Sequence, residues 1–528
     1  MKKTIFSLTL AAVSSVMLSC ASPTEDVYVV LAPESFVNQE TDSLEAADWE
    51  AVVARLQKRH NAELLRFAER PQEQLEELRR ISPRYVAIVD LPEHIGRDYV
   101  IALNQMSRQL DSDPYADFLW GIITGYDADA AMRMLEHSEE PMVIRTGVGS
   151  ILELESAKWF DAYAYVDDHQ VGLCGEKQYG EDTLTHRQIS YKTDMTGANE
   201  RIRRFVQRHF GDTVPDVLRQ FLEYYESYKP DLVVTASHAT EKNLEMPGSV
   251  GNIRCRDGRL YIDYPGKQNF VPDRDSRMVY LPIGNCLIGN VDNTRNSMAI
   301  AWMNSQQATT FVGYVVTTWY GRNGWGGLKY LITNPGRYSV AEAFYLNQQD
   351  MMAQMAEWND SLTVAPFDYD CDYFRKLPAR LTEMAAPGEL SPDEMIFWLG
   401  FWHDRDVLAY YGDPKWDVRM QQVSGETDFT VTSRIEPNPN TGENQPAHRC
   451  VITVKTTPDF SLDRMKGAGF KQEHVLDLPF SYFFPKRLKN PKLPEGESRH
   501  IVVDENFLFW YEPSMEPGQS YEIVVLTD

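Results

Sequence analysis

The chain has 528 residues, of which 77 are acidic and 52 are basic, so its formal net charge is −25. A hydrophobic fraction of 43% and an aromatic fraction of 12% can build sizeable cores, which excludes a generally disordered chain. Because nucleic-acid binding depends on Lys and Arg that neutralise phosphates, the acidic balance also excludes a protein whose main role is to cover nucleic acid.

The N-terminus has the pattern of a secretion signal. Two lysines precede an apolar stretch at 5–18, which is too short to span a bilayer but fits the apolar region of a signal peptide. The sequence Leu-Ser-Cys-Ala that follows resembles the lipobox of bacterial lipoproteins, although Met17 stands where Leu is usual. This resemblance implies cleavage before Cys20 and lipid attachment to that residue. We therefore expect an exported protein that is lipid-anchored to the bacterial envelope, at the outer membrane or the cell surface.

After a signal peptide at 1–19 and a tether at 20–26, short apolar runs alternate with amphipathic stretches of helical length. The apolar runs have the Val, Ile and Leu content of buried strands and lie at 27–32, 84–90, 141–146, 159–166, 231–236, 278–283 and 309–316. The helical stretches lie at 44–58, 97–110, 127–136 and 202–228. Buried strands separated by helices predict an α/β fold with a mostly parallel sheet covered on both faces. We expect two α/β subdomains, at 27–157 and 158–420.

Two segments depart from this α/β pattern. Near 248–270, Asp257-Gly258 separates two strand-like runs, and this dipeptide is typical of a two-residue turn, so we expect a β-hairpin insertion. From 421 to 528, short strand-like runs alternate with loops rich in Pro, Asn and Gly, which is typical of a β-sandwich. These runs lie at 429–433, 450–456, 500–503, 507–511 and 521–526.

The cysteine pattern leaves at least one thiol that could react and contains no metal-site motif. None lies in a CxxC motif or at zinc-ligand spacing from a histidine, so we expect no metal there. An odd number after the lipidation site leaves at least one thiol unpaired in an exported chain, unless chains cross-link. These five residues are Cys174, Cys255, Cys286, Cys371 and Cys450.

Two predicted strand ends carry residues with chemistry. His238 comes just after the run at 231–236, and Cys286 comes just after the run at 278–283. Parallel sheets place functional groups at the carboxyl ends of their strands, so neighbouring strands would direct this imidazole and thiol into one cleft. A histidine can withdraw the thiol proton to give a nucleophilic thiolate and then protonate a leaving amine, as a cysteine peptidase requires. The alternative is an inert, buried cysteine.

Several segments resemble, in the same order, the gingipain family of clan CD cysteine peptidases. The sequence His-Ala-Thr-Glu at 238–241 resembles the family's His-Gly-Ser-Glu element, and Cys286 occupies the place of its nucleophile. The segment 309–319 resembles the next strand, whose end carries a tryptophan near the specificity pocket. The sequence Gly-Asp-Pro at 412–414 resembles the element that closes the catalytic domain.

The resemblance implies a caspase-like and gingipain-like sheet in two subdomains, followed by an immunoglobulin-like sandwich. It implies that the chain is an endopeptidase that hydrolyses peptide bonds of protein or peptide substrates through a dyad of Cys286 and His238. The main-chain N–H groups of Ala239 and Cys286 would hold the oxyanion, and Trp319 would contact substrate. No cofactor is required, and no nucleic-acid partner is expected.

The resemblance also places an acidic partner for the histidine shortly after a strand. That strand resembles the one that begins here at Lys158-Trp159-Phe160, after which the chain offers Asp167 and Asp168. Of the two, Asp168 is preferred.

Some features depart from the family pattern and keep alternatives open. Ala239 replaces the usual glycine, and the hairpin insertion lengthens the segment between the histidine and the cysteine, which favours a catalytically inactive surface binding or assembly lipoprotein. The aromatic residues at 319–330 offer a surface on which a glycan could stack. Asp368, Asp370 and Asp372 alternate as calcium ligands do, but the glycine and bidentate glutamate of an EF-hand are missing, which leaves a looser structural calcium site.

Overall fold

The structure is a computed structural model. It describes residues 26–528 except 38–43, 157–158, 168, 193–194, 196–197, 210, 247, 250, 265–266, 372–374, 386–387, 389, 423–427, 441–444 and 473–474. The predicted signal peptide, the lipidation site Cys20 and the preferred acid Asp168 lie outside the described residues. Across the described ranges, no helix combines the length and the apolar character needed to cross a bilayer.

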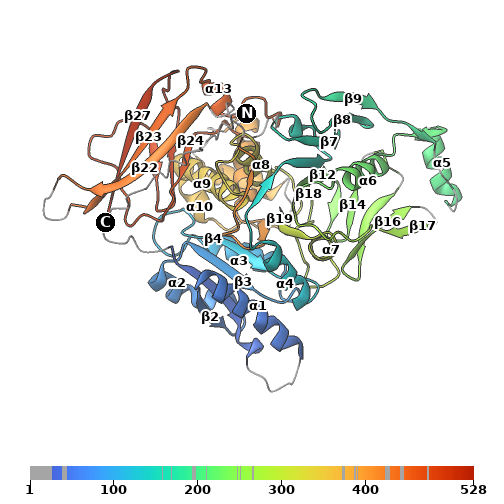
Figure 1. The fold of residues 1–528 in the computed structure, drawn as a ribbon, viewed down its shortest axis with the longest axis horizontal. Coiled ribbons are helices and arrows are strands. Elements are labelled where there is room, and N and C mark those ends of the chain that lie inside the picture. The colour runs from blue at the N-terminus through green and yellow to red at the C-terminus, as the bar shows by residue number, and fades with distance from the viewer. Residues whose placement is uncertain are drawn as a thin grey trace, which may run out of the picture.

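One continuous sheet of twelve strands runs through the α/β body (Figure 1). In spatial order, its first half comprises β2 (Glu63–Phe67), β1 (Tyr28–Pro33), β3 (Tyr85–Val89), β4 (Leu119–Ile123) and β20 (Leu408–Tyr411). Its second half comprises β19 (Ala308–Tyr314), β18 (Met278–Asn285), β12 (Leu232–Ser237), β6 (Thr146–Gly149), β7 (Ala162–Val166), β8 (Leu173–Lys177) and β9 (Thr185–Gln188).

Strand direction reverses once between the two halves. Neighbouring strands are parallel from β2 to β20 and again from β19 to β7, whereas β20 and β19 are antiparallel. β8 and β9 form an antiparallel edge. The prediction of a mostly parallel sheet is confirmed, and the carboxyl ends of the two halves lie at opposite edges.

Helices cover both faces of this sheet. Phe311 and Tyr314 are three residues apart on β19, so their side chains point to opposite faces. Phe311 packs on Tyr280, whose ring centroid lies 4.0 Å from that of Trp302 in α7 (Met298–Ser305). On the other face, the Gly324 N–H of α8 (Arg322–Ile332) donates a hydrogen bond to Tyr314 Oη. The predicted coverage of both faces is therefore present.

The other described helices complete the α/β body and the C-terminal module, and two of them begin with a capping box. They are α1 (Leu44–His60), α2 (Leu75–Ile81), α3 (Arg97–Met106), α4 (Ala128–His137), α5 (Glu200–His209), α6 (Val217–Tyr228), α9 (Val340–Asn359), α10 (Ser361–Val364), α11 (Lys376–Met384), α12 (Pro392–Asp404) and α13 (Leu462–Met465). Three single-turn helices are η1 (Glu34–Phe36), η2 (Pro71–Gln74) and η3 (Leu152–Ser156). Ser339 caps α9 and Ser391 caps α12, each in a capping box with the glutamate three residues later.

A five-stranded antiparallel sheet follows His238 directly. Its strands are β13 (Ala239–Thr240), β14 (Asn243–Glu245), β15 (Asn252–Arg256), β16 (Arg259–Tyr264) and β17 (Lys267–Phe270). β15 and β16 form the expected hairpin, and Asp257 and Gly258 both have positive φ, 51° and 68°, as a type I′ turn requires. A Cβ at Gly258 would lie 2.5 Å from the Tyr126 ring, so the turn packs closely on the α/β body.

The C-terminal module contains two three-stranded antiparallel sheets around a core of its own. One contains β22 (Phe429–Pro437), β23 (His448–Thr456) and β27 (Ser520–Thr527), and the other contains β24 (Phe480–Phe483), β26 (Phe507–Trp510) and β25 (Ile501–Val503). The module packs against the α/β body (Figure 1). Tyr338 Oη, for example, donates to the main-chain oxygen of Ser481 at 2.7 Å. Two small two-stranded sheets pair β10 (Tyr191–Lys192) with β11 (Thr213–Val214) and β5 (Met142–Ile144) with β21 (Val418–Met420).

Candidate active site at the ends of two neighbouring strands

His238 and Cys286 follow the ends of two paired parallel strands. In the pairing of β12 with β18, Ala236 lies opposite Gly284 and Ser237 lies opposite Asn285. Neighbouring strands are about 4.8 Å apart, so the main chain reaches His238 and Cys286 from adjacent positions on one sheet edge. The predicted cleft requires β12 and β18 to be neighbours, and in the structure they are.

A buried hydrogen-bond network ties the two strand ends together. Thr235 Oγ1 donates to Asn285 Oδ1 at 2.5 Å, and Asn285 Nδ2 donates to the main-chain oxygen of Ser237 at 2.9 Å. The Asn285 side chain is fully buried. Asn285 directly precedes Cys286, and Ser237 directly precedes His238. The network therefore fixes the main chain next to both candidate site residues. Asn285 was not predicted as a site residue, although its place directly before Cys286 was a usable signal.

The sulfur of Cys286 is partly accessible and accepts a main-chain hydrogen bond. The residue is half-buried, its thiol is free, and the main-chain N–H of Thr318 donates to its Sγ at 3.3 Å. Thr318 Oγ1 also donates to the main-chain oxygen of Asn285 at 3.0 Å, which holds the loop after β19 against the end of β18.

Three other thiols lie in the interior. Cys174, Cys255 and Cys450 are buried, and burial raises the pKa of each thiol to about 11. These thiols stay protonated near neutral pH and are poor nucleophiles. Among the five cysteines after the predicted lipidation site, only Cys286 and Cys371 are partly accessible.

The turn after Cys286 has an unusual backbone. Leu287 has φ of 61°, a region that residues other than glycine rarely occupy. The main-chain N–H groups of Leu287 and Gly289 donate to the main-chain oxygens of Val316 and Tyr314, at 3.0 and 2.9 Å, which holds the turn against β19. Such backbone positions concentrate at functional sites because the surrounding structure must impose them.

Ala239, the predicted oxyanion donor, lies at the start of the antiparallel sheet. The Glu245 N–H donates to the main-chain oxygen of His238 at 3.0 Å, and Ala239 pairs with Leu244. Antiparallel ladders alternate hydrogen-bonded and non-bonded pairs, so the Ala239 N–H points away from β14. The His238 side chain is exposed. This N–H is therefore directed out of the ladder, and its oxyanion role, like that of the Cys286 N–H, stays a prediction.

The acidic partner of the histidine is not found among the described residues. Asp167 is 4% exposed, and its Oδ1 accepts the main-chain N–H groups of His169 and Gln170 at 2.7 and 2.8 Å. It therefore holds its own loop together. Within the described part of the chain, no carboxylate is hydrogen-bonded to His238, and Asp168 stays a prediction.

A cavity of about 730 Å³ lies beside the turn that follows Cys286. Leu287 and Asn290 line it on the side of the second half of the sheet, Arg70 and His94 line it from loops of the first half, and Tyr99 lines it from α3. Trp319, at the end of the β19 segment, is 50% exposed.

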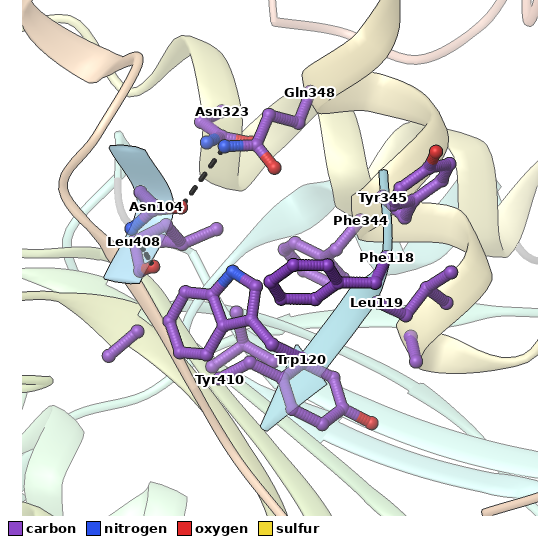
Figure 2. A pocket seen from close by; sticks show the side chains of 13 residues that line it. Asn104, Phe118, Leu119, Trp120, Asn323, Phe344, Tyr345, Gln348, Leu408 and Tyr410 are labelled. Atoms are coloured by element: carbon purple, nitrogen blue, oxygen red, sulfur yellow. Dashed lines mark hydrogen bonds between the residues drawn. The ribbon is translucent and has the colours of Figure 1, made fainter. Parts of the chain in front are cut away.

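A second cavity belongs to the packing of the α/β body. Figure 2 shows it near α9, with the rings of Phe118, Trp120 and Tyr410 around it. Its volume is about 50 Å³, and its described lining contains no acid, histidine or cysteine. Gln348 Nε2 donates to Asn104 Oδ1 at 3.0 Å, and Asn104 Nδ2 donates to main-chain oxygens, so these amide donors already have partners. We assign this cavity no chemistry.

No family model and no curated protein matches this sequence. Among solved structures, the chain is similar to the Arg-specific cysteine proteinase gingipain R, with 8% identity and a TM-score of 0.42 over 82% of this chain and 85% of that one. It is similar to the complex of Porphyromonas gingivalis RgpB pro- and mature domains, with 9% identity and a TM-score of 0.37 over 82% and 87% of the two chains. A structure described as a protease has 6% identity and a TM-score of 0.37, over 82% and 84%. At these values the likeness assigns no activity to this chain.

Proposed function

We propose that this chain is an exported, lipid-anchored cysteine endopeptidase of gingipain type. The observation that carries the proposal is the parallel pairing of β12 with β18, which starts His238 and Cys286 from adjacent positions at one sheet edge. The N–H that Thr318 donates to Cys286 Sγ, and the burial of three other thiols, give further support. The anchor rests on the lipobox-like sequence around Cys20.

The proposed reaction proceeds through an acyl-enzyme. His238 takes the thiol proton of Cys286, and the thiolate attacks the carbonyl carbon of the scissile peptide bond. The main-chain N–H groups of Ala239 and Cys286 hold the oxyanion while the C–N bond breaks, and His238 gives its proton to the leaving amine. Water then attacks the thioester, releases the carboxylic acid and restores the thiol. Asp168 would orient His238, and no cofactor takes part.

The surroundings of Cys286 suit a peptide substrate. The cavity of about 730 Å³ beside Leu287 can accept a substrate side chain. The half-exposed Trp319, which directly follows the Thr318 that contacts Cys286, would contact the substrate. The lipid anchor would keep this cleft at the envelope, where protein and peptide substrates are presented.

The direct test compares the full chain with its Cys286→Ala variant on a mixed peptide library, with products identified by mass spectrometry. We expect the variant to lose at least about 1,000-fold in cleavage rate, because a missing nucleophile removes the covalent route. Cys371→Ala, which removes the other partly accessible thiol, should cleave as the wild type does. Equal cleavage by wild type and Cys286→Ala contradicts the proposal. If a folded wild-type chain cleaves nothing, the binding or assembly lipoprotein becomes the better reading.

A further inference from the structure

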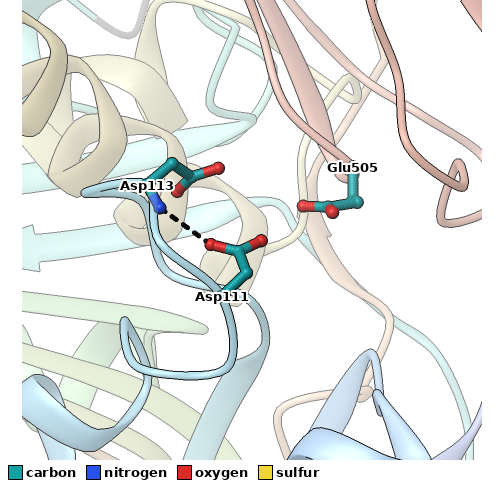
Figure 3. Close-up of side chains that lie close together, drawn as sticks. All are labelled: Asp111, Asp113 and Glu505. Carbon is teal, nitrogen blue, oxygen red and sulfur yellow. Dashed lines mark hydrogen bonds between the residues drawn. The ribbon is translucent and has the colours of Figure 1, made fainter.

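Acidic side chains from two distant segments meet where the α/β body contacts the C-terminal module. Asp111 and Asp113 lie in the loop between α3 and β4, and Asp504 and Glu505 lie in the turn between β25 and β26. Figure 3 shows Asp111, Asp113 and Glu505, whose carboxylates converge from the two segments. One carboxylate oxygen from each of these three lies within 4.8 Å of the other two. We call Asp111, Asp113, Asp504 and Glu505 the interdomain acidic cluster.

The charges of this cluster are poorly neutralised by the protein. Within the described part of the chain, Arg487 is the cation that pairs with a cluster member, and its Nη2 is 3.9 Å from Glu505 Oε1. The same guanidinium is shared with Asp117, whose Oδ1 is 3.8 Å from Nη2. Asp117 is itself a buried acid next to the cluster. One shared guanidinium at these distances leaves an excess of negative charge.

Asp504 supplies an independent sign of a missing ligand. Its side chain is 4% exposed and lies against the carboxyl groups of Asp113 and Glu505. Among the described residues, no group donates a hydrogen bond to Asp504 Oδ2 or to Glu505 Oε2, although both atoms are buried. Buried carboxylate oxygens without a donor or a cation are strongly unfavourable, and a bound cation removes that penalty.

We propose that the interdomain acidic cluster binds a calcium ion that joins the α/β body to the C-terminal module. Calcium takes six to eight oxygen ligands at about 2.4 Å, so opposite ligands lie about 4.8 Å apart, and the three measured oxygens fit inside that sphere. The donors are all carboxylates, which disfavours zinc, and a protein site with several carboxylates is more typical of calcium than of magnesium, which usually keeps several waters. Asp111 is exposed, so ions and coordinating water can enter from its side.

The aspartates considered in the sequence analysis differ from this cluster. Asp370 accepts two hydrogen bonds from the Arg97 guanidinium, at 2.7 and 3.1 Å, so its charge is already paired. Asp368 Oδ1 accepts the Asp370 N–H at 3.1 Å, and Asp372 lies outside the described residues. Asp368 therefore offers a matched control at another acidic site.

The test uses the full chain after EDTA treatment, with calcium added back during thermal unfolding. We expect calcium to raise the melting temperature by about 2 to 5 °C, because a ligand that binds only the folded state stabilises it. Asp504→Asn and Asp113→Asn should lose this shift, while Asp368→Asn should keep it. Terbium luminescence gives a second readout, because a nearby tyrosine can sensitise a bound lanthanide. Tyr115 is such a residue, and its main-chain N–H donates to Asp113 Oδ1 at 2.8 Å.

The melting temperatures of the variants without calcium distinguish a metal site from ordinary packing. In EDTA, Asp504→Asn and Asp113→Asn should melt at or above the wild-type temperature, because each removes a repelling charge. Variants destabilised equally with and without calcium would show a purely structural role and overturn the proposal. A wild type that calcium does not stabilise, or that magnesium stabilises more, would also overturn it. Cys286→Ala should show the full calcium shift, so this result is independent of peptidase activity.

Discussion

At the scale of single residues, burial distinguishes the thiols of this chain. Burial holds Cys174, Cys255 and Cys450 in the protonated form, whereas Cys286 is half-buried and its sulfur accepts the Thr318 N–H. Sequence analysis selected Cys286 because it follows an apolar run. The structure adds Asn285, whose amide bonds both strand ends and so positions the residue that follows it.

Asn285→Ala should slow reaction at Cys286 while costing moderate stability. Its loss leaves the Thr235 hydroxyl and the Ser237 carbonyl without their buried partner, which costs about 1 to 3 kcal/mol of unfolding free energy. It also frees the strand end, so the rate of Cys286 alkylation by iodoacetamide, followed by peptide mass spectrometry, should fall about tenfold. Asn334→Ala is the matched control, because Asn334 is also a buried asparagine that donates to a main-chain oxygen, that of Tyr330 at 3.0 Å. An equal loss of alkylation in both variants would mean that Asn285 has no positioning role.

At the scale of elements, the site depends on the close approach of β12 and β18. A Cβ placed on Gly284 would lie 2.2 Å from the Cβ of Ala236 on the neighbouring strand. The strand pair also carries a register irregularity between Val234 and Ala236, just before the ends that lead to the candidate dyad. Irregular pairing of this kind re-aims the residues that follow it.

Gly284→Ala should therefore push the two strand ends apart. Overpacking of this kind costs about 1 to 3 kcal/mol, and displacement of the strand ends should reduce peptide cleavage or Cys286 alkylation. The double variant Gly284→Ala with Ala236→Gly moves the methyl group to the other strand and should recover most of both properties. Denaturant unfolding and alkylation rates measure the two effects. A single variant with wild-type alkylation would contradict this account of the strand contact.

Local sequence patterns predicted some strands and turns and missed others. The hairpin at Asp257-Gly258 was predictable because both turn residues must take positive φ, and this requirement is visible in their identity. The strands of the C-terminal module were predictable from alternation and turn residues. The extra strands β13, β14 and β17 were not predicted, because their short polar runs have no periodicity that distinguishes them from loops.

Across the whole molecule, a buried ion pair links segments that are distant in the sequence. Asp413, in the Gly-Asp-Pro segment after β20, is fully buried, accepts the Tyr28 hydroxyl at 2.9 Å and contacts His60 Nε2 at 2.7 Å. Arg59 Nη1 is 3.5 Å from its Oδ2. Burial alone would raise the pKa of Asp413, but the hydrogen bond and charge of His60, together with Arg59, bring it below the usual value. The segment is thereby fastened to β1 and α1 in the first half of the sheet.

Asp413→Asn should destabilise the chain in a pH-dependent way. A carboxyl group with a lowered folded pKa stabilises the fold above its unfolded pKa of about 4 and loses that contribution as the pH falls through the folded pKa. Removing one partner of a buried pair costs about 3 to 5 kcal/mol, so the variant should be less stable by that amount at pH 7. The difference should shrink as the pH falls from about 5 towards 3, as measured by denaturant unfolding at each pH. Asp459→Asn, which removes an exposed acid, should show neither effect, and a pH-independent gap for Asp413→Asn would contradict the argument.

The sequence by itself determined the α/β body with its buried strands, the hairpin turn, the β-rich C-terminal module and the pair of strand-end residues His238 and Cys286. These follow from periodicity, turn chemistry and composition, which act over a few residues. Only the tertiary structure decided that the sheet is continuous, that its direction reverses between β20 and β19, that Thr318 faces Cys286, and that Asp113 meets Asp504. Such contacts join distant segments and result from packing the whole core, because the burial of many apolar side chains together selects one strand order and carries the polar residues with it.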